Sequence, residues 1–376
     1  MAFALAGARI FDGLTFKIDH AVIIDGRRIT AVKPVRRVSS RIEIRDLRGG
    51  LLAPGFIDVQ VNGGGGTLLN ADPTVEGVRN IAASHRKFGT TGLLPTVITD
   101  TPEVISGAIA AVREARKSGM ANVLGIHVEG PFLDMRRKGA HDEHFIRVMT
   151  EHDINELAAA DCGRLILTLA PNRVPPAMIE SLTQKGIIVS LGHSEASADE
   201  AAAALKAGAT AFTHIFNAMS QMTGREPGMV GTALADRDSY CGLIADGHHV
   251  HGTAMKVALA AKPLNRIMLI TDAMPPSAGG PDEFELQGRK ATRINGRLQL
   301  ADGTLAGSSL TMDEAVRYCV NKLGVALGDT LRMASLNPAS FLKLDDRLGR
   351  IAKGYLASLV HLSDDLSVGN TWVEGK

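Results

Sequence analysis

The chain has 376 residues, of which 45% are hydrophobic and 22% are charged, a balance that excludes a disordered chain. Its 41 Lys and Arg residues are offset by 40 Asp and Glu residues, so the formal net charge is +1 and no nucleic-acid partner is expected. No apolar run approaches the roughly 18 residues that a membrane span needs, so no membrane partner is expected either.

The number and spacing of the cysteines indicate the cellular compartment that we expect for this protein. Cys162, Cys241 and Cys319 are too far apart for a zinc ribbon or a redox motif, and their odd number argues against a disulfide framework. This usage is typical of a reducing environment, so we expect a cytoplasmic protein.

Both ends of the chain predict short strands, whereas the middle does not. The expected strands at the two ends are Ala4–Phe11, His20–Ile24, Ile29–Val32, Ala357–Leu362 and Trp372-Val373. The Asp25-Gly26 pair between two of them is a typical hairpin turn. One small β domain assembled from residues 1–53 and 346–376 is the simplest interpretation.

The middle of the chain, residues 54–345, alternates strand and helix patterns. Expected strands are Val123–Val128, Leu165–Leu169, Ile187–Leu191, Ala209–Thr213, Tyr240–Ala245 and Ile267–Thr271, and expected helices are Val104–Ser118, Glu195–Ala207 and Met312–Leu323. This alternation indicates a parallel sheet, and the segment is long enough for a (β/α)₈ TIM barrel of about 250 residues. A doubly wound open sheet is the competing fold, but no GxGxxG motif follows the first strand.

Five of the expected strands end at a histidine or a carboxylate. These residues are Glu129, His193, His214, Asp246 and Asp272. Barrel enzymes carry their reactive side chains at the C-terminal ends of the strands, so the five residues are expected to converge.

Two imidazoles and one carboxylate are typical of a three-ligand divalent metal site with a position left for water. Glu129, His193 and His214 are the candidate ligands, and Asp272 is the candidate base that takes a proton from the activated water. The alternatives are histidines that only bond loop backbone and an Asp272 that caps a helix, although the Ala-Met-Pro-Pro that follows favours a loop. This chemistry is hydrolytic and needs no redox cofactor.

Several segments along the chain form a recognisable set of motifs. They are Pro54–Asp58, Gly125–Phe132, Gly192–Ser194, Thr213–Met219, Leu269–Met274, Ala306–Leu310 and Asn337–Ala339. They resemble the amidohydrolase superfamily and, within it, the N-acetylglucosamine-6-phosphate deacetylases. The resemblance covers the whole chain, and HVEGPF and HxxNAM are its specific motifs.

The resemblance implies a (β/α)₈ barrel with a small β-sandwich formed from both termini. It also implies hydrolysis of the acetamide of N-acetyl-D-glucosamine 6-phosphate, giving acetate and D-glucosamine 6-phosphate in amino-sugar catabolism. Glu129, His193 and His214 match the family's metal ligands, Asp272 matches its acid and base, and His141 matches the residue that contacts the substrate carbonyl.

Further positions match the family's contacts with the phosphorylated N-acetyl amino sugar. They are Ala140, Asn217, Ala218, Arg225, His249 and the backbone at Leu305, Ala306 and Gly307. In the family a neighbouring subunit completes the phosphate site, so the resemblance implies a homodimer.

One departure from the wider superfamily concerns the number of metal ions. Many members carry His-x-His after Ile-Asp, but this chain has Gln60 and Asn62 there. An amide oxygen is a much weaker ligand for a transition metal than an imidazole. We therefore expect one divalent ion per subunit, first of all Zn²⁺ with Fe²⁺, Mn²⁺ and Co²⁺ as alternatives, and a second position that is weak or vestigial.

Three alternative functions remain open. One is deacetylation of N-acetylgalactosamine 6-phosphate, which differs in one hydroxyl configuration. A cyclic amidase or aminoacylase of the same superfamily is disfavoured by the HxxNAM segment, by Arg225 and by the missing His-x-His. A non-catalytic sugar-phosphate sensor is disfavoured because the candidate ligands and base are all present.

Overall fold

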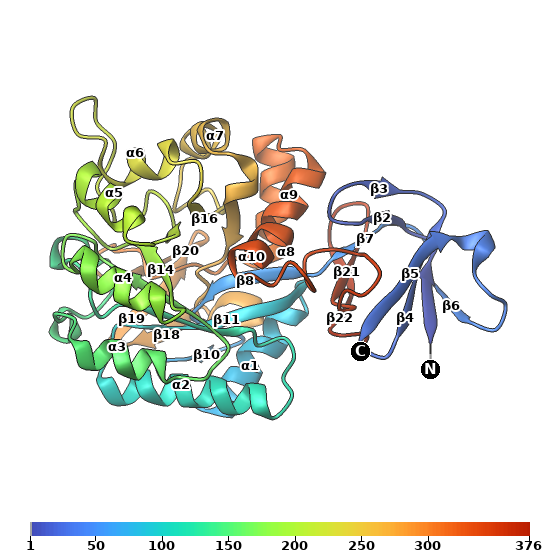
Figure 1. Ribbon diagram of the computed structural model, residues 1–376, viewed down its shortest axis with the longest axis horizontal. Coiled ribbons are helices and arrows are strands. Elements are labelled where there is room, and N and C mark those ends of the chain that lie inside the picture. Colours follow the sequence, from blue (N-terminus) through green and yellow to red (C-terminus); the bar gives the residue numbers. More distant parts are fainter. Residues whose placement is uncertain (1) are drawn as a thin grey trace.

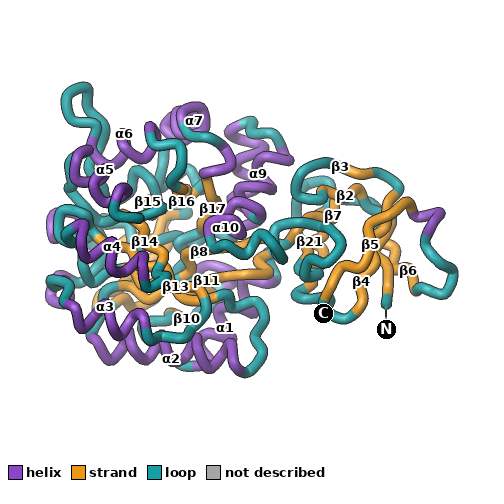
Figure 2. The backbone as a smooth tube through the Cα atoms, viewed as in Figure 1, coloured by secondary structure: helices purple, strands orange, loops and turns teal. Residues whose placement is uncertain are grey.

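The computed structural model describes residues 2–376, and parallel strands at its centre curl into a barrel (Figures 1 and 2). Neighbouring strands pair in the chain order β8, β11, β12, β13, β14, β15, β16 and β17. Val61 and Ala273 form a parallel bridge between the two ends of this sheet, and the Asp272 N–H donates to the Gln60 carbonyl at 3.0 Å. The strands are β8 (Phe56–Val61), β11 (Thr90–Ile98), β12 (Gly125–Glu129), β13 (Arg164–Leu169), β14 (Ile188–Leu191), β15 (Ala211–Phe212), β16 (Tyr240–Ile244) and β17 (Ile267–Ile270). The expected (β/α)₈ fold is confirmed.

Helices follow the barrel strands and cover the outside of the barrel (Figure 1). α2 shows why they form, since Thr101 caps its first turn, Pro102 occupies that turn, and Ala108 and Val112 face the core. The helices are α1 (Val75–Arg86), α2 (Pro102–Lys117), α3 (Glu151–Ala158), α4 (Pro176–Gln184), α5 (Ala198–Lys206), α6 (Gly228–Ala235), α7 (Gly252–Ala261), α8 (Met312–Tyr318), α9 (Leu327–Ala334) and α10 (Leu336–Phe341). None of the helices in this part of the chain is long and apolar enough to cross a membrane.

Some element boundaries differ from those expected. The helix expected over Glu195–Ala207 begins only at Ala198, because Ser197 and Glu200 form a capping box and Glu195 instead pairs with Arg137. The helix expected over Met312–Leu323 is α8 followed by one π turn over Cys319–Leu323, which ends at Gly324 with a φ of 74°.

A β-sandwich packs beside the barrel and joins both ends of the chain (Figure 1). One sheet has the order β5-β4-β1-β6 and the other β22-β21-β7-β2-β3, in which β21 pairs with β7 from Leu359 opposite Pro54. The strand expected over Ala4–Phe11 is broken into β1 and β2 at Gly7, which has a φ of 82°. The strands are β1 (Phe3–Ala6), β2 (Arg9–Phe11), β3 (Phe16–Lys17), β4 (His20–Asp25), β5 (Arg28–Pro34), β6 (Glu43–Asp46), β7 (Leu51–Pro54), β21 (Leu359–Leu362) and β22 (Val368–Trp372).

Two small insertions lie near the C-terminal ends of the barrel strands. One is the β9–β10 hairpin (Gly63–Gly64 and Thr67–Leu68), and the other is the antiparallel sheet β18-β19-β20 (Glu283–Leu286, Arg289–Ile294 and Arg297–Leu300). They share an apolar cluster that includes Leu68, Met274, Leu298 and Ala306. This packing fixes the segment before Gly307 against the loop that follows β17.

Candidate functional site

Three side chains from neighbouring strands converge at the mouth of the barrel. Glu129 ends β12, while His193 and His214 lie two residues beyond β14 and β15. The Glu129 Oε1 atom lies 3.1 Å from His193 Nε2 and 3.0 Å from His214 Nε2, and the two Nε2 atoms are 3.0 Å apart. All three residues are buried, and their ligand atoms together form a group that could hold a metal ion.

The donor chemistry of this group fits a cation. His193 Nδ1 lies 2.9 Å from the Arg137 carbonyl oxygen, which only accepts, so Nδ1 carries the ring proton. In a neutral ring, Nε2 therefore presents a lone pair to the Glu129 carboxylate and to His214. Burial raises the pKa of Glu129, but its hydrogen bonds and charge interactions with the two histidines hold that pKa well below its ordinary value. A divalent ion satisfies such a set of one carboxylate and two imidazoles.

Backbone strain marks the same positions. His193, His214 and Asp272 have φ values of 47°, 30° and 52°, in the left-handed region that L-residues rarely adopt. This conformation costs a non-glycine residue roughly 1–2 kcal/mol. Residues held in this way cluster at functional sites, so the strain favours a role in chemistry for these three positions.

Asp272 lies beside the three candidate ligands. It follows β17, and its Oδ1 accepts hydrogen bonds from Asn62 Nδ2 at 2.6 Å and from Gln60 Nε2 at 3.2 Å. Burial, together with the charge of Glu129, raises the pKa of Asp272 to about 6. A carboxyl group whose pKa is near neutrality is suited to accept a proton and to return it.

Gln60 and Asn62 act here as hydrogen-bond donors. Gln60 Nε2 lies 3.1 Å from each carboxylate oxygen of Glu129 and also contacts Asp272, so one amide group links the two carboxylates. Because both amide groups direct their N–H groups at carboxylates, their geometry gives no support for a second set of metal ligands.

Metal analysis should therefore find about one tightly bound ion per chain. The two amides offer donors where a second ion would need acceptor atoms or imidazoles. Elemental analysis after extensive dialysis measures the ratio, and two retained ions per chain would contradict this reading of Gln60 and Asn62.

His141 completes the inner part of the site. Its ring centroid lies 4.4 Å from that of His193, and its Nδ1 lies 2.8 Å from Thr99 Oγ1. Burial, followed by the charge of His193, lowers the pKa of His141 to about 3, so the ring is neutral. The Thr99 hydroxyl has one proton and also lies 3.3 Å from the Glu129 carbonyl oxygen, which is the longer of its two contacts. In the tautomer in which Thr99 donates to His141 Nδ1, the ring proton lies on Nε2, which is then a donor for a substrate oxygen.

Most of the other predicted contact residues lie in loops at this mouth. The Asn217 N–H donates to the His214 carbonyl at 2.9 Å, and His249 Nδ1 lies 2.6 Å from Asp246 Oδ2. The segment Leu305, Ala306 and Gly307 leads directly to Ser308, whose N–H donates to the Asp272 carbonyl at 2.9 Å. Ala140 precedes His141, and Ala218 follows Asn217.

Arg225 is placed differently. It is exposed, and it forms no hydrogen bond or ion pair with another residue of the described chain. Its loop projects from the body before α6, at the upper left of Figure 1. The structure therefore does not bring Arg225 into the inner cluster of Glu129, His193 and Asp272.

Two contributors were not expected from the sequence. Thr99 contacts His141, and it directly follows β11, so the same rule of polar residues at strand ends would have found it. Asp134 does not directly follow a strand, so this rule would not have found it. Its N–H donates to the His193 carbonyl at 2.9 Å, and its carboxylate accepts from Asn172 at 2.6 Å, so it holds the His193 loop.

Comparison with known proteins agrees with this geometry. Residues 51–376 match the amidohydrolase family and residues 2–52 match the NagA composite domain. An N-acetylgalactosamine-6-phosphate deacetylase of Shewanella sp. (strain ANA-3) is 43% identical, over 92% of this chain and 86% of its own. An N-acetylglucosamine-6-phosphate deacetylase of Haemophilus influenzae is 36% identical, over 100% of this chain and 99% of its own.

A solved structure gives the same result. The N-acetylglucosamine-6-phosphate deacetylase of Pasteurella multocida superposes with a TM-score of 0.97 at 35% identity, over 100% of this chain and 99% of that chain. These matches extend over both the barrel and the β-sandwich. The chain therefore belongs to the amidohydrolase family and, within it, to the N-acetylglucosamine-6-phosphate deacetylases.

Proposed function

We propose that this chain hydrolyses the acetamide of N-acetyl-D-glucosamine 6-phosphate to D-glucosamine 6-phosphate and acetate, in amino-sugar catabolism. The observation that carries the proposal is the convergence of Glu129, His193 and His214 beside Asp272. An acetate-release assay on the 6-phosphosugar tests it, and no release by metal-loaded protein would refute it.

Glu129, His193 and His214 would hold one divalent ion, most simply Zn²⁺, with Fe²⁺, Mn²⁺ and Co²⁺ as alternatives. When bound, such an ion supplies Lewis-acid chemistry, because it acidifies water and polarises a carbonyl. We place this chemistry in the barrel of residues 54–345, with residues 1–53 and 346–376 as the β-sandwich.

The side chains then divide the proton transfers. Asp272 takes a proton from water as the water oxygen attacks the acetyl carbon, and it later gives that proton to the departing amine nitrogen as the C–N bond breaks. His141 Nε2 donates to the oxygen that becomes negative, a contribution of about 3–4 kcal/mol in comparable sites. Gln60 and Asn62 hold the Asp272 carboxylate in place throughout.

The sugar phosphate is proposed to bind away from the reacting amide. Asn217, Ala218, Arg225 and His249 match the family's phosphate and sugar contacts, and the backbone at Ala140 and Leu305–Gly307 lines the sugar. We propose a homodimer, in which the projecting loop of Arg225 reaches the site of the second subunit. The exposure of Arg225 and its lack of a partner within residues 2–376 support this arrangement.

A cytoplasmic location is also proposed, since Cys162, Cys241 and Cys319 are all free and buried in the structure.

N-acetylgalactosamine 6-phosphate is the second candidate substrate. The Shewanella relative, at 43% identity, carries that name. The two epimers differ in one hydroxyl configuration, so side-by-side values of kcat/KM decide between them.

The Arg225→Ala variant should lose its preference for phosphorylated over neutral N-acetyl sugars. Removing a guanidinium that binds phosphate removes binding energy that orients the amide, so kcat as well as KM should suffer. Arg237→Ala is the matched control, because Arg237 is an exposed arginine in the loop between α6 and β16. Unchanged discrimination in Arg225→Ala would exclude Arg225 from phosphate binding.

A further inference from the structure

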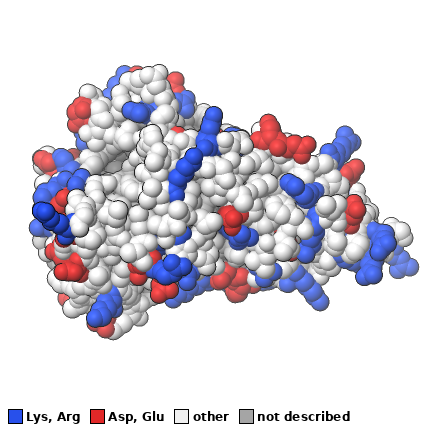
Figure 3. Space-filling model, turned by 90° about the horizontal axis from the view of Figure 1, so that it is seen from above, with Lys and Arg blue, Asp and Glu red and all other residues white. Residues whose placement is uncertain are grey.

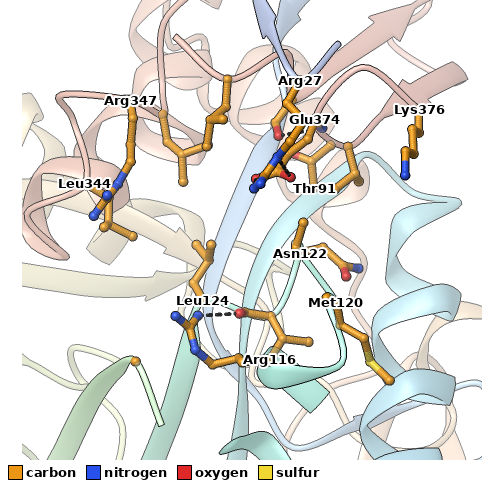
Figure 4. Close-up of a pocket in the computed structure, with 18 of the residues that line it drawn as sticks. Arg27, Thr91, Arg116, Met120, Asn122, Leu124, Leu344, Arg347, Glu374 and Lys376 are labelled. Atoms are coloured by element: carbon orange, nitrogen blue, oxygen red, sulfur yellow. Dashed lines mark hydrogen bonds and ion pairs between the residues drawn. The ribbon is translucent and has the colours of Figure 1, made fainter. Parts of the chain in front are cut away.

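A cavity lies at the end of the barrel opposite to the candidate metal ligands, where the barrel meets the β-sandwich (Figure 4). Its volume is about 950 Å³. Thr91, Leu124 and Arg164 line it at or next to the starts of β11, β12 and β13, whereas Glu129 lies at the far end of β12. At a rise of about 3.3 Å per residue, β12 alone separates the two sites by roughly 13 Å.

The lining of this cavity is strongly basic. The arginines that line it are Arg27, Arg28, Arg86, Arg116, Arg164 and Arg347. Among the described residues that line the cavity, Glu374 supplies the one acidic side chain. Its Oε2 atom already pairs with Arg27 Nε at 2.6 Å. A cluster of this kind is unexpected in a chain with a net charge of only +1. Figure 3 shows positive and negative side chains mixed over the face that it draws.

Most of these arginines contact backbone carbonyls, which orient a guanidinium without neutralising it. Arg116 donates to the Val123 carbonyl at 2.7 Å, and Arg164 donates to the Lys343 carbonyl at 3.0 Å. Arg347 lies 3.6 Å from Asp346, an exposed carboxylate that screens it only weakly.

Arg116 also shows that the positive groups are close enough to affect one another. Burial, and then the charges of Arg164 and Arg347, lower the pKa of Arg116, an effect that Cys162 and Asp161 partly offset. Figure 4 shows Arg27, Arg116 and Arg347 reaching the cavity from different walls. Each guanidinium retains further N–H donors for an anion.

Part of the remaining wall is apolar, beside the polar side chains of Thr91, Asn122 and Ser358. Met120, Leu124, Leu344, Leu348 and Leu356 line the same cavity. The lining therefore combines an anion-binding side with a surface that can cover an uncharged group, and the volume lies in the range of about 300–1,000 Å³ of small-molecule sites.

We propose that this cavity binds a small organic anion with two or more phosphate groups. The phosphates face Arg116, Arg164 and Arg347, whose planar guanidinium groups match phosphate oxygens in pairs, and the uncharged body packs on the leucines. Because Arg27, Arg28 and Arg347 come from the two segments of the β-sandwich and Arg86, Arg116 and Arg164 come from the barrel, the bound anion links the two domains. A ligand that binds only the folded state also raises the melting temperature.

Isothermal titration calorimetry with ATP, tripolyphosphate and inorganic phosphate tests this site. ATP should bind the purified metalloprotein at one site per chain, more tightly than tripolyphosphate, and inorganic phosphate should bind weakest. Arg116→Gln, Arg164→Gln and Arg347→Gln should each weaken ATP roughly tenfold, because each removes charged hydrogen bonds. Arg347 is exposed, so Arg347→Gln does not threaten folding.

Lys117→Gln is the matched control, since Lys117 adjoins Arg116 on α2 but pairs with Glu114 outside the cavity. Lys117→Gln should bind ATP with the affinity of the wild type. If ATP also contacts the bound metal ion, the heat of that contact is the same in all variants and does not affect the comparison. An equal loss in Lys117→Gln, or no binding at all, overturns the proposal. Binding that falls in Arg225→Ala but not in Arg116→Gln places the anion at the catalytic mouth and also overturns it. If tripolyphosphate and ATP bind with equal affinity, the leucines do not bind the uncharged body of the ligand, and the proposal of an organic anion is overturned.

Discussion

Replacing Asp272 by Asn should lower kcat by a factor of about 10²–10⁴, the range that general acid–base catalysis contributes, while metal content stays unchanged. Asparagine has nearly the same shape and keeps an oxygen that can accept from Asn62 Nδ2, which lies 2.6 Å from Asp272 Oδ1. What it loses is the ability to take up and release a proton. Acetate release under saturating 6-phosphosugar gives kcat, and elemental analysis of the same sample gives the metal content.

Asp302→Asn is the control for this change, because Asp302 is an exposed carboxylate that bonds only its own turn. It should leave kcat unchanged. Full activity in Asp272→Asn would refute the role of Asp272 as base. A loss of the metal ion in Asp272→Asn would instead show that Asp272 is itself a ligand.

Replacing Glu129 by Gln should remove the metal ion and lower kcat/KM by more than about 10³-fold. Glu129 supplies the one negative charge in the proposed ligand set, and an amide oxygen is a weaker ligand for a transition metal. At a metal concentration about 1,000 times Kd, binding stabilises the folded wild-type protein by roughly 4 kcal/mol. Adding a chelator should therefore lower the melting temperature of the wild type but not that of Glu129→Gln.

Glu156→Gln is the matched control, since Glu156 lies on the exposed face of α3 beside His152. It should keep its metal ion and its activity. If Glu129→Gln retained a full equivalent of metal with normal activity, the proposed ligand set would be wrong.

Where a strand could be predicted from the sequence, the functional residue at its C-terminal end could be predicted as well. Glu129, His193, His214 and Asp272 could be placed together because parallel strands in a barrel end at the same edge. Thr99 was missed because no strand was expected over β11, although the whole of β11 is buried and apolar enough to form one. The hydrogen bond between Gln60 and Glu129 could not be predicted, because it joins β8 and β12, which lie on either side of β11 and do not pair.

By itself, the sequence determined the alternation of strands and helices, the residue types at the strand ends and the absence of His-x-His after Ile57-Asp58. These are local properties, because each depends on neighbours a few residues away. Only the tertiary structure decided the left-handed backbone at the site, the link that Gln60 makes between two carboxylates, and the basic cavity. Arg27, Arg116 and Arg347 are far apart in the sequence. They share a cavity only because β7 pairs with β21 and brings the β-sandwich against the barrel.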